Sequence, residues 1–420
     1  MGKRNTFMFP AGALLAFFLL LPAHALAEEC TTVVVSGSAT VDGRPLLWKN
    51  RDWSDRDNKL AYLADGPVAA VAIVKPGNSA SAYMGVNEKG FAIEQSDSSD
   101  LEGTSAAANA RFLRYALLHC STLTEFEMLL ARTNGPGRET KGNYGVIDAT
   151  GAAAMFELGN HTFRKYDTAN PEDAPNGFIV RTNFAFSGNG TGTGQARYER
   201  ASELIKKAAF SRTLSHGFLL RVVARDLKND VIDPYPLPFA RGQDGRPVGY
   251  IRTFNSISRF RTVSCVVFHG VLPGEDPQLT TMWTILGEPV CGIALPTWLL
   301  AGSVPPELGG PASAPLNDMI GVKKASCYPL ASSPEYLYTA ALDDGHGGGA
   351  FSYTFPIENR ALARAATLRA EWRASLPTPQ AVAAAQNKIT REANECFLAS
   401  SVPKDGLSSP LKLICRTLER

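Results

Sequence analysis

The residue best suited to covalent chemistry is Cys30, which follows Glu28 and Glu29 at the end of an apolar leader. If everything before Cys30 is removed, one residue carries both a thiol and a primary amine. An α-amine has a pKa of about 7.7–8.0 and a thiol one of about 8.5, so the amine can take the thiol proton near neutral pH. The thiolate can then attack a carbonyl, and the ammonium can protonate the leaving amine. This chemistry needs no histidine.

The thiol of Cys30 can also release the residues in front of it. Attack on the Glu29 carbonyl gives a thioester, and its hydrolysis frees Glu28-Glu29. The chain has seven cysteines, so the six others can form up to three disulfides and leave Cys30 unbridged. Two of the six, Cys120 and Cys265, lie in apolar runs and also fit buried thiols. The competing interpretation makes Cys30 an ordinary disulfide partner.

The first 27 residues predict an export signal. A positively charged start precedes an unbroken apolar run from 11 to 21, and small residues recur at alternate positions up to Ala27. This run is shorter than the ~18 apolar residues of a spanning helix, and no later segment reaches that length. We expect 1–27 to be a signal peptide and 28–29 a short propeptide. The mature chain is then secreted or periplasmic and has no membrane span.

The composition excludes several classes of protein. The 420 residues include 42 basic and 40 acidic side chains, with a formal charge of +2 and 45% hydrophobic residues. These values do not fit a disordered tail, a collagen, a coiled coil or a strongly basic nucleic-acid binder. We therefore expect a folded protein without a nucleic-acid partner.

A predicted hairpin places polar side chains beside Cys30. Residues 31–35 are β-branched and apolar, a second strand-like segment follows, and Asp42-Gly43 between them is a turn signal. A hairpin that turns there folds Cys30 back toward a partner near residue 55. The polar stretch 49–52 then lies within a few residues of the amino end of the first strand. The alternative interpretation of this stretch is a solvated strand end.

The remaining elements come in blocks of strands and blocks of helices. Strands are expected at 45–48, 68–74, 81–86, 91–93, 144–148, 153–157, 178–181, 262–268 and 280–286. Helices are expected at 106–119, 123–132, 196–209 and 216–226, and across 359–399 with a break at 377–379. Such blocks predict an α+β fold in which antiparallel sheets are covered by helices. We expect a surface loop at 305–316 and a helical C-terminal extension at 355–420 that packs on the main domain.

Several motifs resemble one known family. Cys30-Thr31-Thr32, Asp42-Gly43 and Asn50-Arg51-Asp52-Trp53 resemble the opening of the cysteine-type N-terminal-nucleophile (Ntn) hydrolases. Within them the chain is most similar to the acyl-CoA:6-aminopenicillanate acyltransferase-like branch, which is related to choloylglycine hydrolase. Further similar stretches follow in order at 84–91, 143–148, 180–184 and 270–276. The resemblance implies a four-layer αββα sandwich of two antiparallel sheets, which we assign to 30–354.

The resemblance also implies an activity and a set of site residues. The expected reaction is cleavage or transfer at a linear, non-peptide N-acyl amide of a small molecule, through an acyl-enzyme on Cys30. By position, Asp52 orients the amino terminus and thiol, and Asn183 donates to the oxyanion, where one lost donor can cost about 10²–10³ in rate. The late active-site arginine is matched best by Arg261, with Arg259 as the alternative. The candidate substrate-binding residues are Asn87, Arg51 and Arg259.

Two other functions stay open. The same opening resembles exported dipeptidases of the wider superfamily, which require a free α-amine on the substrate, and a secreted binding protein would hold Cys30 in a disulfide. Choloylglycine hydrolases carry an arginine where this chain has Lys49, which argues against bile-salt specificity. No histidine pair has zinc-ligand spacing, and the glycine-rich stretch 343–349 lacks a phosphate-loop ending. We expect no metal and no cofactor.

Overall fold

The structure is a computed structural model that describes residues 29–104, 109–242 and 245–400. The predicted signal peptide, Glu28 and Cys415 lie outside the described residues. Within the described ranges, none of the helices is both long and apolar enough to span a bilayer.

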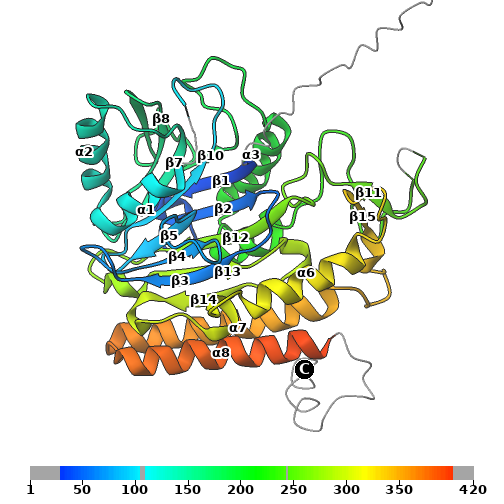
Figure 1. The fold of residues 1–420 in the computed structure, drawn as a ribbon. Helices are drawn as coiled ribbons and strands as arrows, with labels where there is room; N and C mark the ends of the chain where they lie inside the picture. The colour runs from blue at the N-terminus through cyan, green and yellow to red at the C-terminus, as the bar shows by residue number, and fades with distance from the viewer. Residues whose placement is uncertain (1–28, 105–108, 243–244, 401–420) are drawn as a thin grey trace, which may run out of the picture.

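Two antiparallel sheets form the centre of the molecule (Figure 1). The first sheet has the order β10-β1-β2-β12-β13-β14, so β1, which carries Cys30, lies inside the sheet. Its strands are β1 (Glu29–Val35), β2 (Leu46–Asp52), β10 (Phe178–Arg181), β12 (Thr262–His269), β13 (Thr281–Ile285) and β14 (Leu295–Trp298). The second sheet follows the chain through β3 (Lys59–Leu63), β4 (Ala70–Val74), β5 (Met84–Asn87), β6 (Ala92–Ser96), β7 (Gly142–Ile147), β8 (Ala153–Leu158) and β9 (Phe163–Asp167). A separate ribbon pairs β11 (Tyr250–Arg252) with β15 (Tyr336–Tyr338).

Helices cover the outer faces of both sheets. The second sheet is covered by α1 (Asn109–His119) and α2 (Leu123–Asn134), whose apolar side chains share one buried cluster with that sheet. The first sheet is covered by α3 (Gln195–Phe210), α7 (Phe351–Ala374) and α8 (Pro379–Ala399), and Figure 1 shows α7 and α8 side by side next to β14. The remaining α-helices are the short α4 (His216–Phe218) and α5 (Pro306–Gly309) and the 13-residue α6 (Pro315–Cys327). The predicted α+β sandwich with C-terminal helices is confirmed.

The two sheets pack face to face next to the residues that follow Cys30. A Cβ atom on Gly145 of β7 would lie 2.7 Å from Leu47 Cδ1 and 3.0 Å from Val34 Cγ2. A glycine at this position therefore lets β7 approach β1 and β2 closely. Because alternate residues of a strand share a face, the side chains of Thr32 and Cys30 lie on the same inner face as Val34. The thiol of Cys30 thus points into the space between the sheets.

Several predicted elements need correction. Val35 pairs with Leu46, so the link between β1 and β2 is a ten-residue connection that includes the short helix Gly37–Ala39. A turn does form at 41–43, with Gly43 at a φ of 75°, but it lies within this longer connection and does not join the two strands directly. As a result, Cys30 pairs with Arg51 and not, as predicted, with a residue near 55. The stretch 305–316 is a loop only in part, because α5 forms within it and α6 begins at Pro315.

Candidate active site

Cys30 is the second residue of β1, and its side chain is fully buried. It pairs directly with Arg51 of β2, so both side chains share the inner face of the sheet. No disulfide joins any two of the cysteines in the described ranges, so among these the structure favours buried thiols over the disulfides that the cysteine count allows. Cys120 and Cys265 are instead buried thiols, and burial raises the pKa of each to about 12. Neither of those two thiols is a nucleophile near neutral pH.

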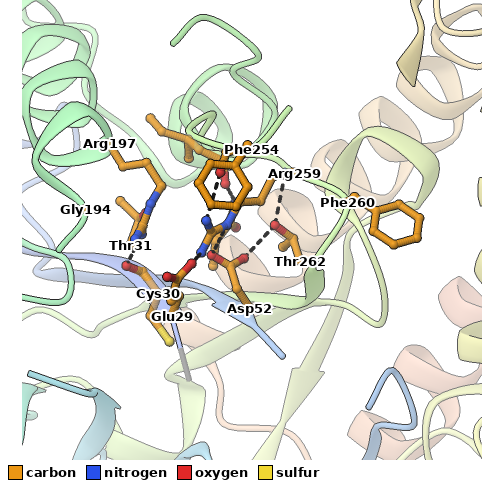
Figure 2. Close-up of polar contacts among 12 residues, drawn as sticks. Glu29, Cys30, Thr31, Asp52, Gly194, Arg197, Phe254, Arg259, Phe260 and Thr262 are labelled. Carbon is orange, nitrogen blue, oxygen red and sulfur yellow. Dashed lines mark hydrogen bonds and ion pairs between the residues drawn. The ribbon is translucent and has the colours of Figure 1, made fainter. Parts of the chain in front are cut away.

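Asp52 ends β2 at the edge of the same cluster. It pairs with Glu29 across β1 and with Thr262 across β12. Its carboxylate accepts a hydrogen bond of 2.7 Å from Thr262 Oγ1 and one of 2.8 Å from Arg259 Nε (Figure 2). Asp52 is fully buried, and these partners compensate its charge. Because Cys30 pairs with Arg51, Asp52 lies one residue further along β2 than the direct partner of Cys30.

Arg259, and not the preferred Arg261, contacts this carboxylate. The turn before β12 is closed by Thr262 N donating to Arg259 O at 2.7 Å and by Arg259 N donating to Thr262 Oγ1 at 3.1 Å. This turn carries the Arg259 side chain back over the end of β2, where it contacts both Asp52 and the Glu29 carboxylate. Figure 2 shows the next residue, Phe260, pointing away from the cluster. Arg261 lines a neighbouring cavity instead.

Asn183 follows β10 and contacts the backbone of Cys30 through its amide oxygen, whereas the predicted role was donation of an N–H to an oxyanion. Its Oδ1 accepts from Cys30 N at 3.0 Å and from Arg197 Nη2 at 2.8 Å, while its Nδ2 donates to Asp97 O at 2.9 Å. Because both the Cys30 amide and the guanidinium are donors, the atom between them must be the amide oxygen. Asn183 thus holds the backbone nitrogen of Cys30 through its amide oxygen.

Arg197 is a site residue that the sequence reasoning missed. It lies near the start of α3, and Figure 2 shows it beside Cys30 and Thr31, where it donates to the Cys30 carbonyl and to Thr31 Oγ1 at 3.0 Å. It also donates to Asn183 Oδ1 at 2.8 Å. Burial, together with the charge of Arg259, lowers its pKa to about 10, which leaves it protonated at neutral pH. A signal was present in the sequence, because Arg197 shares the otherwise apolar face of α3 with Ala201 and Ile205.

The cluster is strongly cationic and holds Glu29 in its charged form. Burial acts to raise the pKa of Glu29, but the charges of Arg259 and Arg197 outweigh it, and the net pKa lies below the ordinary value. Arg259 shows the converse effect. Burial lowers its pKa, but the carboxylates of Asp52 and Glu29 outweigh this effect and raise it. Two acidic and two basic side chains therefore form one interdependent network around the Glu29–Cys30 peptide bond.

Two further predicted residues lie in different places. Arg51 is on the inner face beside Cys30, where its guanidinium stacks 3.7 Å from the centre of the Tyr83 ring and donates to Asn58 Oδ1. Asn87, predicted to bind substrate, instead belongs to the other face of the second sheet. Its Nδ2 donates to the carbonyls of Leu117 and Cys120, at the end of α1. These bonds tie Asn87 into a turn, so its assignment to the substrate pocket is corrected.

A cavity of about 580 Å³ adjoins the network. Thr262, which contacts Asp52, lines it together with Arg261, and its walls include the large side chains of Trp53, Ile320 and Tyr328. Most of its lining is apolar, with a few charged groups, which is the usual character of a small-molecule pocket. The side of the cavity away from β12 is built by α6, an element that the sequence analysis did not predict.

A second cluster brings together Asp42, His216 and His269, with ligand atoms close enough to hold a metal ion. Arg369 Nη1 lies 2.8 Å from His269 Nδ1, and His269 Nε2 lies 2.7 Å from Asp42 Oδ2. Because Arg369 can only donate, His269 Nδ1 accepts and its Nε2–H donates to Asp42. Metal binding at Nε2 would move that proton to Nδ1, against the guanidinium. The donor set thus fits a hydrogen-bonded chain better than a metal centre.

Comparisons with known proteins give structural likenesses and no sequence match. No protein-family model matches the chain, and no curated protein matches it. A variant of the conjugated bile acid hydrolase from Clostridium perfringens is 12% identical with a TM-score of 0.39, covering 61% of this chain and 89% of that one. The Caenorhabditis elegans N-acylethanolamine-hydrolyzing acid amidase ortholog is 14% identical with a TM-score of 0.39, covering 57% and 92%. Penicillin V acylase from Agrobacterium tumefaciens is 14% identical with a TM-score of 0.38, covering 64% and 86%.

Proposed function

We propose that this chain is an exported, self-processing Ntn amidohydrolase that cleaves linear, non-peptide N-acyl amides through an acyl-enzyme on Cys30. The observation that carries the proposal is the hydrogen bond from Cys30 N to Asn183 Oδ1, next to the buried Asp52–Arg259 pair. Polar groups from β2, β10, β12 and α3 converge on one peptide bond, and that bond precedes a cysteine. A purely structural strand end has no need for such a convergence.

Self-processing comes first in this mechanism. The Cys30 thiol adds to the Glu29 carbonyl carbon, and the C–N bond to Cys30 breaks as the nitrogen takes up a proton. The product is a thioester between Glu29 and the Cys30 sulfur, and water hydrolyses it. Asn183 keeps the released amine in place because its oxygen accepts an N–H bond before and after cleavage. Asp52 supplies negative charge close to the new ammonium group.

Turnover then repeats the same chemistry on an external amide. The α-amine takes the thiol proton, and the thiolate attacks the acyl carbonyl. The ammonium returns the proton to the leaving amine, and water releases the acid from the acyl-enzyme. An amine acceptor in place of water would give acyl transfer. The adjoining cavity, bordered by Thr262 and Arg261, offers room for one of the two halves of the substrate.

The dipeptidase alternative fits the electrostatics less well. A dipeptidase must bind the α-ammonium group of its substrate, whereas the cluster around Glu29 contains Arg259 and Arg197, with Arg261 close enough to act on the Glu29 charge. These cations repel an ammonium group and attract an anion. The binding-protein alternative requires Cys30 in a disulfide, and the described cysteines form none.

The variant Cys30→Ala tests the proposal. It should fold with an unchanged circular dichroism spectrum, keep the residues in front of position 30 and hydrolyse no N-acyl amide. The matched control is Cys265→Ala, which removes a buried thiol from the same sheet and should retain both processing and turnover. Amide hydrolysis by Cys30→Ala at the wild-type rate would overturn the proposed function.

A further inference from the structure

The position of Glu29 indicates which functional group an acyl group bound at this site can carry. Its carbonyl is the one that Cys30 attacks in the proposed self-processing, so the Glu29 residue occupies the acyl side of the site. Its side chain ends in a carboxylate that contacts Arg259, and only 25% of that side chain is exposed. The first acyl group carried by the Cys30 sulfur is therefore a glutamyl group whose free carboxylate is bound by an arginine.

Loss of Glu29 leaves this site with excess positive charge. Among the described residues, Arg259 has salt bridges to Asp52 and Glu29, and only Asp52 stays after processing. Arg197 donates to neutral oxygens of Cys30, Thr31 and Asn183, so it brings no further anion. Both guanidinium groups are buried, where a charge without a counter-ion is costly.

A neighbouring arginine adds to the excess positive charge. Arg261 is close enough to lower the pKa of the Glu29 carboxyl, and it lines the adjoining cavity. Its buried Nη2 has no hydrogen-bond partner within the described part of the chain. An acceptor supplied by a bound anion would satisfy this donor. The mature site thus contains two positions, at Arg259 and at Arg261, where an anionic group would replace the lost carboxylate.

We propose that the mature enzyme, if it acts as an amidohydrolase as proposed above, prefers acyl groups that carry a terminal carboxylate, with the glutaryl skeleton of Glu29 as the best fit. In Glu29 the backbone carbonyl and the side-chain carboxylate are the two ends of a glutaryl unit. A monoamide of glutaric acid places its carbonyl at the Cys30 sulfur and its carboxylate at Arg259. The S–C bond forms, the C–N bond breaks, the thiol proton leaves with the amine, and water then releases glutarate.

The test compares two p-nitroanilides that differ only in this charge. Fully processed protein, verified by intact mass, is assayed with N-glutaryl-p-nitroanilide and with the neutral N-valeryl-p-nitroanilide. We expect kcat/KM to favour the glutaryl compound by at least about tenfold. Arg259→Lys should reduce this ratio toward one, because an ammonium group cannot serve Asp52 and the substrate with the geometry of a planar guanidinium. The matched control Arg111→Lys, an exposed arginine of α1, should keep the wild-type ratio.

A second readout does not depend on turnover. Glutarate should slow the alkylation of Cys30 by iodoacetamide in the processed protein, and valerate at the same concentration should not. Active enzyme that prefers the valeryl compound would overturn the inference and leave the proposed function standing. Protection by glutarate without hydrolysis of either anilide would overturn the proposed function and leave the anion site standing. Equal alkylation rates with glutarate and valerate would overturn the anion site.

Discussion

Asp52 lies directly across the β1–β2 pair from Glu29, while Cys30 lies across from Arg51. The buried carboxylate is therefore in register with the residue that precedes Cys30, the proposed nucleophile, and one guanidinium, that of Arg259, contacts both acidic side chains. This relationship ties Glu29, which the proposed self-processing releases, and Asp52, which stays, into one network. On that proposal, the charge network of the mature site is assembled before processing.

Arg259 and Arg261 should differ sharply when each is replaced by glutamine. Arg259→Gln leaves the buried Asp52 without its cationic partner, and breaking a buried ion pair costs about 3–5 kcal/mol. We expect a markedly lower Tm and loss of self-processing. Arg261→Gln should process at close to the wild-type rate, because the hydrogen bonds and the salt bridge described for Asp52 come from Arg259 and Thr262. Intact mass measured over time follows the processing of both variants. Equally slow processing of Arg259→Gln and Arg261→Gln would contradict the assignment of Arg259 as the partner of Asp52.

Arg197→Met should slow both processing and turnover by about 10²–10³. The reason is that Arg197 holds the Cys30 carbonyl, the Thr31 hydroxyl and the Asn183 amide oxygen at once. Methionine fills a similar length without donating to any of them. The comparison variant is Arg200→Met on the same helix, whose guanidinium contacts Asp226 away from Cys30. Wild-type kinetics in Arg197→Met would remove Arg197 from the site.

Glu29→Gln should slow self-processing about tenfold, since the contact with Arg259 loses its charge. Glu29 has a lowered pKa, so its ionised form contributes above the ordinary value near 4.5 and is lost only as pH falls through the lowered value. The difference between the two proteins should therefore persist at pH 5 and shrink in stronger acid. Once residue 29 has left, the mature enzymes are identical. Different kcat/KM values for the two purified, active proteins would show that residue 29 is retained in the active enzyme.

The sequence predicted the parts of the site that depend on local pattern. The strands predicted at 31–35 and 45–48 from strand propensity are confirmed as parts of β1 and β2. The polar stretch 49–52 lies beside Cys30 as predicted, but it does so as a continuation of β2. The register of the two strands was wrong by four residues, because a short helix in the connection has no strong sequence signature. Which of Arg259 and Arg261 contacts Asp52 is decided by a turn in which the Thr262 hydroxyl accepts a hydrogen bond from Arg259 N. The positions of the two arginines in the sequence do not reveal this turn.

Contacts between distant segments were harder to predict. Arg197 contacts Cys30 from a helix, and the two residues are 167 positions apart in the chain. A charged residue on the buried face of a helix signals a polar partner without identifying it. Asn87 shows the opposite error, since a motif match placed it in the pocket and its hydrogen bonds hold it against α1. The positions of both Arg197 and Asn87 depend on how the helices pack against the two sheets.

Acid should destabilise the fold through the cluster at His216. Its ring stacks on His269 with centroids 4.1 Å apart, next to Asp42, Arg369 and Arg44. Burial lowers the pKa of His216 to about 4, so the unfolded chain binds more protons than the folded one between about 4 and the ordinary value near 6.5. Stability is therefore lost as pH falls through this window. The drop in Tm from pH 7 to pH 5 should be smaller in His216→Gln, and an equal drop would contradict this account.

The most direct test is the intact mass of the purified, active protein after expression from the full-length chain. The account predicts a mass that begins at Cys30, and the same preparation of Cys30→Ala retains at least Glu29. An active wild-type sample in which Glu29 is still attached would contradict the central claim, because Cys30 would then have no free α-amine with which to act.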